Sequence, residues 1–92
     1  MSTDVLELPE VEVHTDKEQQ PKIVVFNDDH NSFDHVIRCL VTFCKHSVEQ
    51  AEQCAWIIHT RGKYAVKHGS LEELLPINEA LGINDLTSEI QY

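Results

Sequence analysis

The sequence predicts a small α+β domain with the element order β-α-α-β-α-β. Two observations lead to this class. Three short runs have the alternating or β-branched composition of strands, and between them lie longer segments whose apolar residues recur every three to four positions, as in helices. The chain has 92 residues, which fit one domain. We therefore expect a three-stranded sheet, antiparallel or mixed, with the helices packed on one face.

Residues 1–21 differ in composition from the rest of the chain. Residues 1–20 contain six acids against one lysine, and their Val and Leu residues stand isolated between the acids. A segment with few apolar residues and a high net charge buries too little surface to stay folded by itself. We therefore expect a mobile acidic N-terminal extension over residues 1–21 and a folded domain over residues 22–92.

The first strand is predicted at Lys22–Phe26, the most β-prone run in the sequence. Asn31 or Ser32 can then cap a helix that runs to about Lys45 or His46. Apolar residues repeat along this helix at helical spacing. They are Phe33, Val36, Ile37, Leu40 and Cys44.

A second helix is predicted to begin after Ser47, which forms a capping-box pattern with Gln50, and to end at Gly62. One face of this helix groups several side chains. They are Val48, Ala51, Ala55, Ile58 and His59. Residues 63–67 follow, and their alternation of apolar and polar side chains predicts a second strand.

The third helix is predicted to begin after Ser70, which pairs with Glu73 in another capping-box pattern, and to end at Gly82. Pro76 lies inside this span and removes one helical hydrogen bond, so we expect a kink there or two short helices in succession. Residues 86–91 alternate in polarity and predict the closing strand.

The charge and the cysteines indicate the compartment and the kind of partner. The formal net charge is −9, and no cluster of Lys and Arg is present to replace counterions on a phosphate backbone or an anionic membrane. We expect cationic partners, with no binding of nucleic acid or membranes. The acidic start is unlike a signal peptide. Cys39, Cys44 and Cys54 lack C-x-x-C spacing and fall among apolar helical residues, which predicts reduced core thiols in a cytoplasmic protein.

Candidate chemistry centres on Asn27, Asp28, Asp29 and His30, which follow the first strand directly. Together with His59, the two aspartates could form the active site of a small metal-dependent or acid–base hydrolase. Yet the sequence has no H-x-x-x-H, H-E-x-x-H or C-x-x-C spacing. The sequence also offers no clear nucleophile, because the cysteines are predicted to be core residues and three serines are predicted to be helix caps. These serines are Ser32, Ser47 and Ser70.

The same residues suit an ammonium ligand. A free α-amino group has a pKa near 8 and needs short-range acceptors, which Asn27, an aspartate and the His59 imidazole could supply. Apolar residues on the two helices would complete such a pocket. Two further hypotheses stay open. In the first, the sole role of Asp28 and Asp29 is to accept hydrogen bonds from backbone N–H groups at the helix start. In the second, the acidic extension binds the partner and the pocket does not. Between the two acids, we favour Asp28 for the ligand.

Three segments of the sequence resemble the ClpS family of adaptors for the ATP-dependent Clp protease. They are KIVVFNDD at 22–29, Val36-Ile37, and Ala51-Glu52-Gln53 leading to IHTRGK at 58–63. The similarity covers about residues 22–74. It implies an adaptor without enzymatic activity or cofactor, which binds proteins with N-terminal Leu, Phe, Tyr or Trp. The partner it implies is a ClpA-type AAA+ unfoldase, and we expect the adaptor to be a monomer.

The resemblance also implies residue roles. The α-amino group would be held by Asn27, Asp28, Asp29 and His59, and the side-chain pocket would be lined by Asn31, Phe33, Val36, Ala55 and Ile58. Glu72 matches an acidic position that contacts the unfoldase. The sequence departs from the family pattern at three positions. Met is common at the position of Phe33 and frequent at that of Ala55, and a basic residue is expected where Ile77 stands.

Overall fold

The structure is a computed structural model that describes residues 20–92. Its elements occur in the predicted order: β1 (Lys22–Phe26), α2 (Phe33–Cys44), α3 (Val48–Arg61), β2 (Lys63–His68), α4 (Leu71–Ile83) and β3 (Thr87–Gln91). The proposed N-terminal extension lies, apart from its last two residues, outside the described part. Within residues 20–92, no helix has the length and apolar composition needed to span a membrane.

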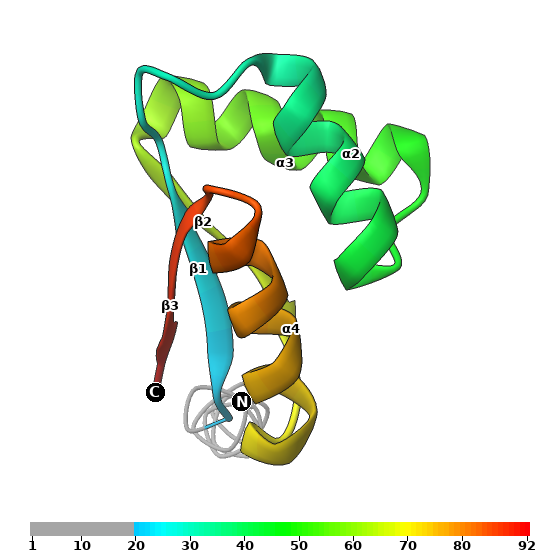
Figure 1. Ribbon diagram of the computed structural model, residues 1–92, viewed down its shortest axis with the longest axis vertical. Helices are drawn as coiled ribbons and strands as arrows, with labels where there is room; N and C mark the ends of the chain where they lie inside the picture. Colours follow the sequence, from blue (N-terminus) through cyan, green and yellow to red (C-terminus); the bar gives the residue numbers. More distant parts are fainter. Residues whose placement is uncertain (1–19) are drawn as a thin grey trace, which may run out of the picture.

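The sheet has the strand order β2-β1-β3, and both pairs are antiparallel (Figure 1). Of the two arrangements that the sequence allowed, the structure thus has the antiparallel one. β1 is the central strand, and its three middle residues are buried. Ile23 pairs with Lys67 while Val24 pairs with Ala65, so β2 carries one extra residue, as in a β-bulge.

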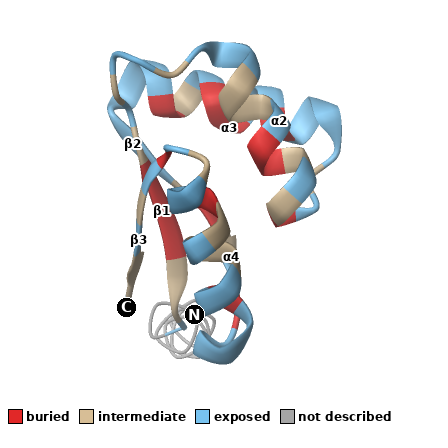
Figure 2. Cartoon of the chain, viewed as in Figure 1, coloured by how far each residue is buried: buried red, intermediate tan, exposed pale blue. Residues whose placement is uncertain are grey.

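One hydrophobic core joins the sheet to all three helices, as the sequence predicted. Ile23 and Val25 point to the same face of β1, because side chains alternate along a strand. The helices add Cys39, Leu40 and Cys44 from α2, Ala51, Cys54 and Ile58 from α3, and Leu74 and Leu81 from α4. α4 lies alongside the strands, whereas α2 and α3 lie near the end of the sheet where β1 stops (Figures 1 and 2).

The three predicted serine caps are confirmed. Ser32, Ser47 and Ser70 each accept a hydrogen bond from the backbone N–H three residues later, at 3.1–3.2 Å. The Ser70 N–H in turn donates to the Glu73 carboxylate, which completes the predicted capping box. At Ser47 the structure shows only the first of these two bonds. α3 ends at Gly62, whose φ of 96° is left-handed, as expected for a C-cap.

Of the two outcomes expected at Pro76, the succession of two short helices is wrong, because α4 runs as one helix from Leu71 to Ile83. The missing proline N–H deprives only the Glu72 carbonyl of its helical donor, and both residues are exposed to water. Leu74 and Leu81 lie on either side of the proline with no exposed surface. Burying two leucines contributes about 3–6 kcal/mol, which is enough to offset the roughly 3 kcal/mol that an interior proline costs.

The five side chains predicted to share one face of α3 differ in their burial. Ala51, Ala55 and Ile58 are buried, but Val48, the first residue of the helix, is 57 % exposed and His59 is exposed as well. The exposure of His59 places its imidazole at the surface, next to the buried Ile58. The end of α3 is therefore where the core meets solvent.

The three cysteines are buried and free, which confirms the prediction of core thiols. Burial raises the pKa of all three thiols, and that of Cys44 rises to about 11. Because only the thiolate is a strong nucleophile, these side chains are poorly reactive at neutral pH.

Two neighbouring leucines of α4 test how much the core contributes to stability. Leu74 is fully buried, whereas Leu75 is 53 % exposed. We expect Leu74→Ala to lower the free energy of unfolding by about 2–5 kcal/mol, because it removes buried methyl groups and leaves a cavity. Leu75→Ala should change it by less than about 0.5 kcal/mol. Urea denaturation of both variants measures the difference, and equal losses would contradict this assignment of the core.

Candidate functional site

A backbone hydrogen bond fixes the end of β1 to the end of α3. The Asn27 N–H donates to the Gly62 carbonyl at 2.8 Å, and the Gly62 N–H donates to the Ile58 carbonyl at 2.9 Å. These two bonds connect the first residue after the strand with the last turn of the helix. They bring Asn27 and its neighbours close to Ile58 and His59, although these segments lie about 30 residues apart in the chain.

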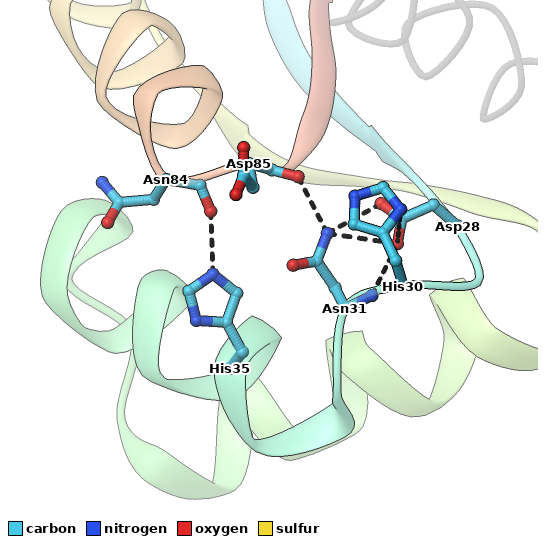
Figure 3. A network of polar contacts seen from close by, with 6 residues as sticks. All are labelled: Asp28, His30, Asn31, His35, Asn84 and Asp85. Carbon is cyan, nitrogen blue, oxygen red and sulfur yellow. Dashed lines mark hydrogen bonds and ion pairs between the residues drawn. The ribbon is translucent and has the colours of Figure 1, made fainter.

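The loop after β1 is held in shape by Asp28 and Asn31. The Asp28 carboxylate accepts hydrogen bonds from the Asn31 backbone N–H at 3.0 Å and from its side-chain amide at 2.9 and 3.1 Å. The same amide donates to the Asp85 carbonyl at 2.8 Å (Figure 3). The loop is therefore closed by its own side chains and attached to the turn between α4 and β3.

Sequence reasoning missed the role of that turn. Besides the bond to Asp85, the Asn84 carbonyl lies 2.8 Å from Nε2 of His35 on α2 (Figure 3). Asp85 has a left-handed φ of 72°, a conformation that Asp tolerates better than most residues. The Asn-Asp pair does signal a turn. Its contact with Asn31, 54 positions away, has no local signal.

The environment of Asp28 favours its charged form. Partial burial acts to raise the pKa of this carboxyl, but the hydrogen bonds from Asn31 and the nearby His30 outweigh it and hold the pKa below its ordinary value. His30 contributes little, because it is 71 % exposed and its Nδ1 lies 3.9 Å from the carboxylate. Asp28 thus carries a full negative charge at neutral pH.

The two aspartates differ in their partners. Asp28 does satisfy a backbone N–H at the helix entrance, as one hypothesis allowed, while the N-cap of α2 itself is Ser32. Asp29 is exposed, and within residues 20–92 its carboxylate takes part in no hydrogen bond or ion pair. Its oxygens are free to accept hydrogen bonds from a ligand.

All nine residues named for the ligand site line one open cavity of about 230 Å³. They are Asn27, Asp28, Asp29, Asn31, Phe33, Val36, Ala55, Ile58 and His59. The loop after β1 and the exposed end of α3 supply the polar groups, and α2 and α3 supply the apolar ones. The cavity therefore combines hydrogen-bond acceptors with an apolar interior. What each residue binds remains a prediction.

The apolar residues of the cavity differ in depth. Ala55 and Ile58 are buried in α3, and Val36 is half-buried in α2. Phe33 was predicted as part of the apolar face of its helix, but it is 41 % exposed. Its ring lies on the rim, edge-on to the His59 ring at a centroid distance of 6.3 Å. Trp56, which sequence reasoning missed, packs against both rings.

The hydrolase hypothesis finds no nucleophile among its candidates. The three serines cap helices and the three cysteines are buried thiols with raised pKa values. In the part of the chain that the structure describes, no group of three or more His, Cys, Asp or Glu residues is placed to hold a metal ion. Asp28, Asp29 and His59 instead line the open cavity described above.

The predicted unfoldase contact lies away from this cavity. Glu72 is exposed in the first turn of α4. Ile77, where the resemblance implied a basic residue, is half-buried and packs against the core. The side chain at this position therefore contributes to stability, and a contact through Glu72 would lack the neighbouring basic group.

Comparisons with known proteins identify the family and agree with the fold. The family model described as "ATP-dependent Clp protease adaptor protein ClpS" matches residues 16–81. The structure of Agrobacterium tumefaciens ClpS2 bound to L-phenylalaninamide is similar, with a TM-score of 0.67 and 18 % sequence identity over 77 % of this chain and 95 % of that one. No curated protein matches the sequence. At this identity the solved structure establishes the fold, and the family match covers most of the chain. The chain therefore belongs to the ClpS family, the adaptor proteins of the ATP-dependent Clp protease.

Proposed function

We propose that the cavity binds the N-terminal residue of substrate proteins that carry a free α-amino group and a Leu, Phe, Tyr or Trp side chain. The protein would then deliver these substrates to a Clp-type AAA+ unfoldase for degradation. The proposal rests on one observation: the same cavity has a charged rim with hydrogen-bond acceptors and an apolar interior. The related ClpS2 structure contains L-phenylalaninamide, a compound with a free amine and one aromatic side chain.

The rim suits an α-ammonium group, which presents three N–H donors at neutral pH. The Asn27 side-chain carbonyl and the His59 imidazole can serve as acceptors at the cavity. Asp28 supplies a negative charge, although Asn31 already occupies part of its acceptor capacity. Asp29 adds carboxylate oxygens that are free for the ligand. An uncharged N-terminus would forfeit most of these interactions.

The interior suits one hydrophobic side chain. Ala55 and Ile58 form buried walls, Val36 adds a third, and Phe33 borders the opening. Burying one Leu or Phe side chain contributes about 1.5–3 kcal/mol, and each charge-assisted hydrogen bond contributes about 1.5–3 kcal/mol. After the entropy of association is subtracted, a micromolar dissociation constant is expected. Such an affinity lets an adaptor release its substrate.

Delivery to the unfoldase would use a separate surface. We assign this contact to Glu72, which is exposed on α4. In this scheme the protein acts in the cytoplasm as a monomer without a cofactor, and it catalyses no reaction. A ClpA-type unfoldase is the partner that the family resemblance implies.

Acetylation of the substrate amine tests the proposal directly. We expect an acetylated Leu-initiated peptide to lose binding, because acetylation removes the charge and two of the three donors. Fluorescence anisotropy with labelled free and acetylated peptides of identical sequence measures the effect. Equal affinity for the two peptides would exclude recognition of the N-terminus.

The role of His59 can be separated from a general effect of losing a histidine. His59→Ala should weaken binding of the free peptide about tenfold, since one charge-assisted contact is lost. His68→Ala is the matched control, because His68 is exposed at the end of β2 and lies outside the cavity. Wild-type affinity in His59→Ala, or an equal loss in the control, would rule out this assignment.

The pH dependence of binding follows from the substrate amine. Binding favours the ammonium form, so the amine pKa is raised in the complex and affinity is lost as the pH rises above the free value near 8. The lowered pKa of Asp28 keeps that carboxylate charged throughout this range. Between pH 7 and pH 9.5 we expect the dissociation constant to rise about 30-fold. A constant affinity, with circular dichroism confirming a folded protein, would show that the ammonium charge is not recognised.

A further inference from the structure

Three aromatic rings meet at the rim of the cavity. Phe33 lies 6.4 Å from Trp56 and 6.3 Å from His59, and Trp56 lies 6.3 Å from His59, measured between ring centroids. Phe33 contacts both neighbours edge-to-face, at interplanar angles of 75° and 89°. Phe33 and His59 line the cavity, whereas Trp56, the only tryptophan of the chain, does not. We call these three side chains the aromatic cluster.

The cluster is exposed, so its rings depend on one another for their positions. Phe33 is 41 % exposed and Trp56 is 59 % exposed, and His59 is also open to solvent. Exposed side chains sample several rotamers unless a neighbour restricts them. Trp56 and His59 lie three residues apart on α3, where side chains are neighbours, and Phe33 is the first residue of α2. Trp56 thus contacts one cavity residue from each helix.

We propose that Trp56 is a specificity-determining positioning residue of this site, which holds the rings of Phe33 and His59 in place from outside the cavity. This inference rests on the proposed function. By positioning His59, Trp56 supports binding of the α-amino group, which all substrates share. Through Phe33 it fixes an aromatic wall that a Phe, Tyr or Trp side chain can contact edge-to-face, a contact that Leu cannot make.

The inference predicts a change in preference and not only in affinity. In Trp56→Ala the Phe33 ring becomes free to turn, so a Phe-initiated peptide should lose more affinity than a Leu-initiated one. Loss of about one aromatic pair contact should change the ratio of the two dissociation constants by roughly two- to tenfold. Trp56→Phe keeps an aromatic neighbour and should restore most of the wild-type ratio.

The experiment measures dissociation constants for Phe- and Leu-initiated peptides with identical remaining sequence, by fluorescence anisotropy. The proteins are the wild type, Trp56→Ala, Trp56→Phe and the control Val48→Ala. Val48 is 57 % exposed on the same helix and lies outside the cluster, so its variant should keep the wild-type ratio. Both peptides titrate the same folded molecules, and the ratio is therefore insensitive to any loss of stability.

A double-mutant cycle with Phe33→Ala tests whether Trp56 acts through Phe33. In the Phe33→Ala background, Trp56→Ala should leave the ratio unchanged. A ratio that still changes there would mean that Trp56 contacts the substrate directly, and would overturn the inference. So would a wild-type ratio in the single variant Trp56→Ala. If the wild-type protein binds neither free-amine peptide, it is the proposed function that fails.

Discussion

The hydrogen bond from the Asn27 N–H to the Gly62 carbonyl is the contact on which the site depends. It extends the pairing of β1 with β2 by one step beyond Phe26 and Lys63, and it does so at the residue that ends α3. Gly62 can serve both elements because its left-handed φ of 96° turns the chain from helix to strand. A Cβ atom there would meet nothing within 4 Å, so the need for glycine arises from the backbone conformation alone.

A second set of contacts prepares the charge of the site in advance. Asn31 holds the Asp28 carboxylate with three hydrogen bonds and anchors the loop to the Asp85 carbonyl (Figure 3). The donors that shape the loop are the same donors that lower the pKa of the carboxylate. A ligand that binds an ordered, charged rim incurs less entropic cost than one that must order it. The loop is thus preorganised by residues that line the cavity.

Two carboxylates and a histidine around a cavity are also the components of many hydrolytic sites, and their surroundings determine which chemistry they suit. Here the cavity is open, the candidate serines are occupied as helix caps, and the thiols are buried within the core. The ClpS family consists of adaptor proteins. In such a protein, a carboxylate with a lowered pKa is suited to holding a cation, since a general acid needs a raised one.

The sequence by itself determined the six elements and their order, because apolar periodicity, serine caps and Gly62 act over a few residues. It also placed the cysteines in the core, since they fall in helical apolar patterns. Residue types suggested an amine site with apolar walls from two helices, and the resemblance to a family completed the set of nine cavity residues. Spacing alone left Asp28, Asp29 and His59 open between a hydrolase, an amine site and simple caps.

Only the tertiary structure decided the features that depend on contacts between distant segments. α4 continues as one helix through Pro76 because two buried leucines hold it to the core, whereas the local pattern also allowed two short helices. The bond from Asn31 to Asp85 and the position of Trp56 beside Phe33 follow from how the helices pack. A single sequence encodes local conformation through neighbouring residues, whereas these contacts arise from the shape of the whole core. For that reason local sequence patterns predicted the helices and strands, whereas tertiary packing determined which side chains meet at the rim of the cavity.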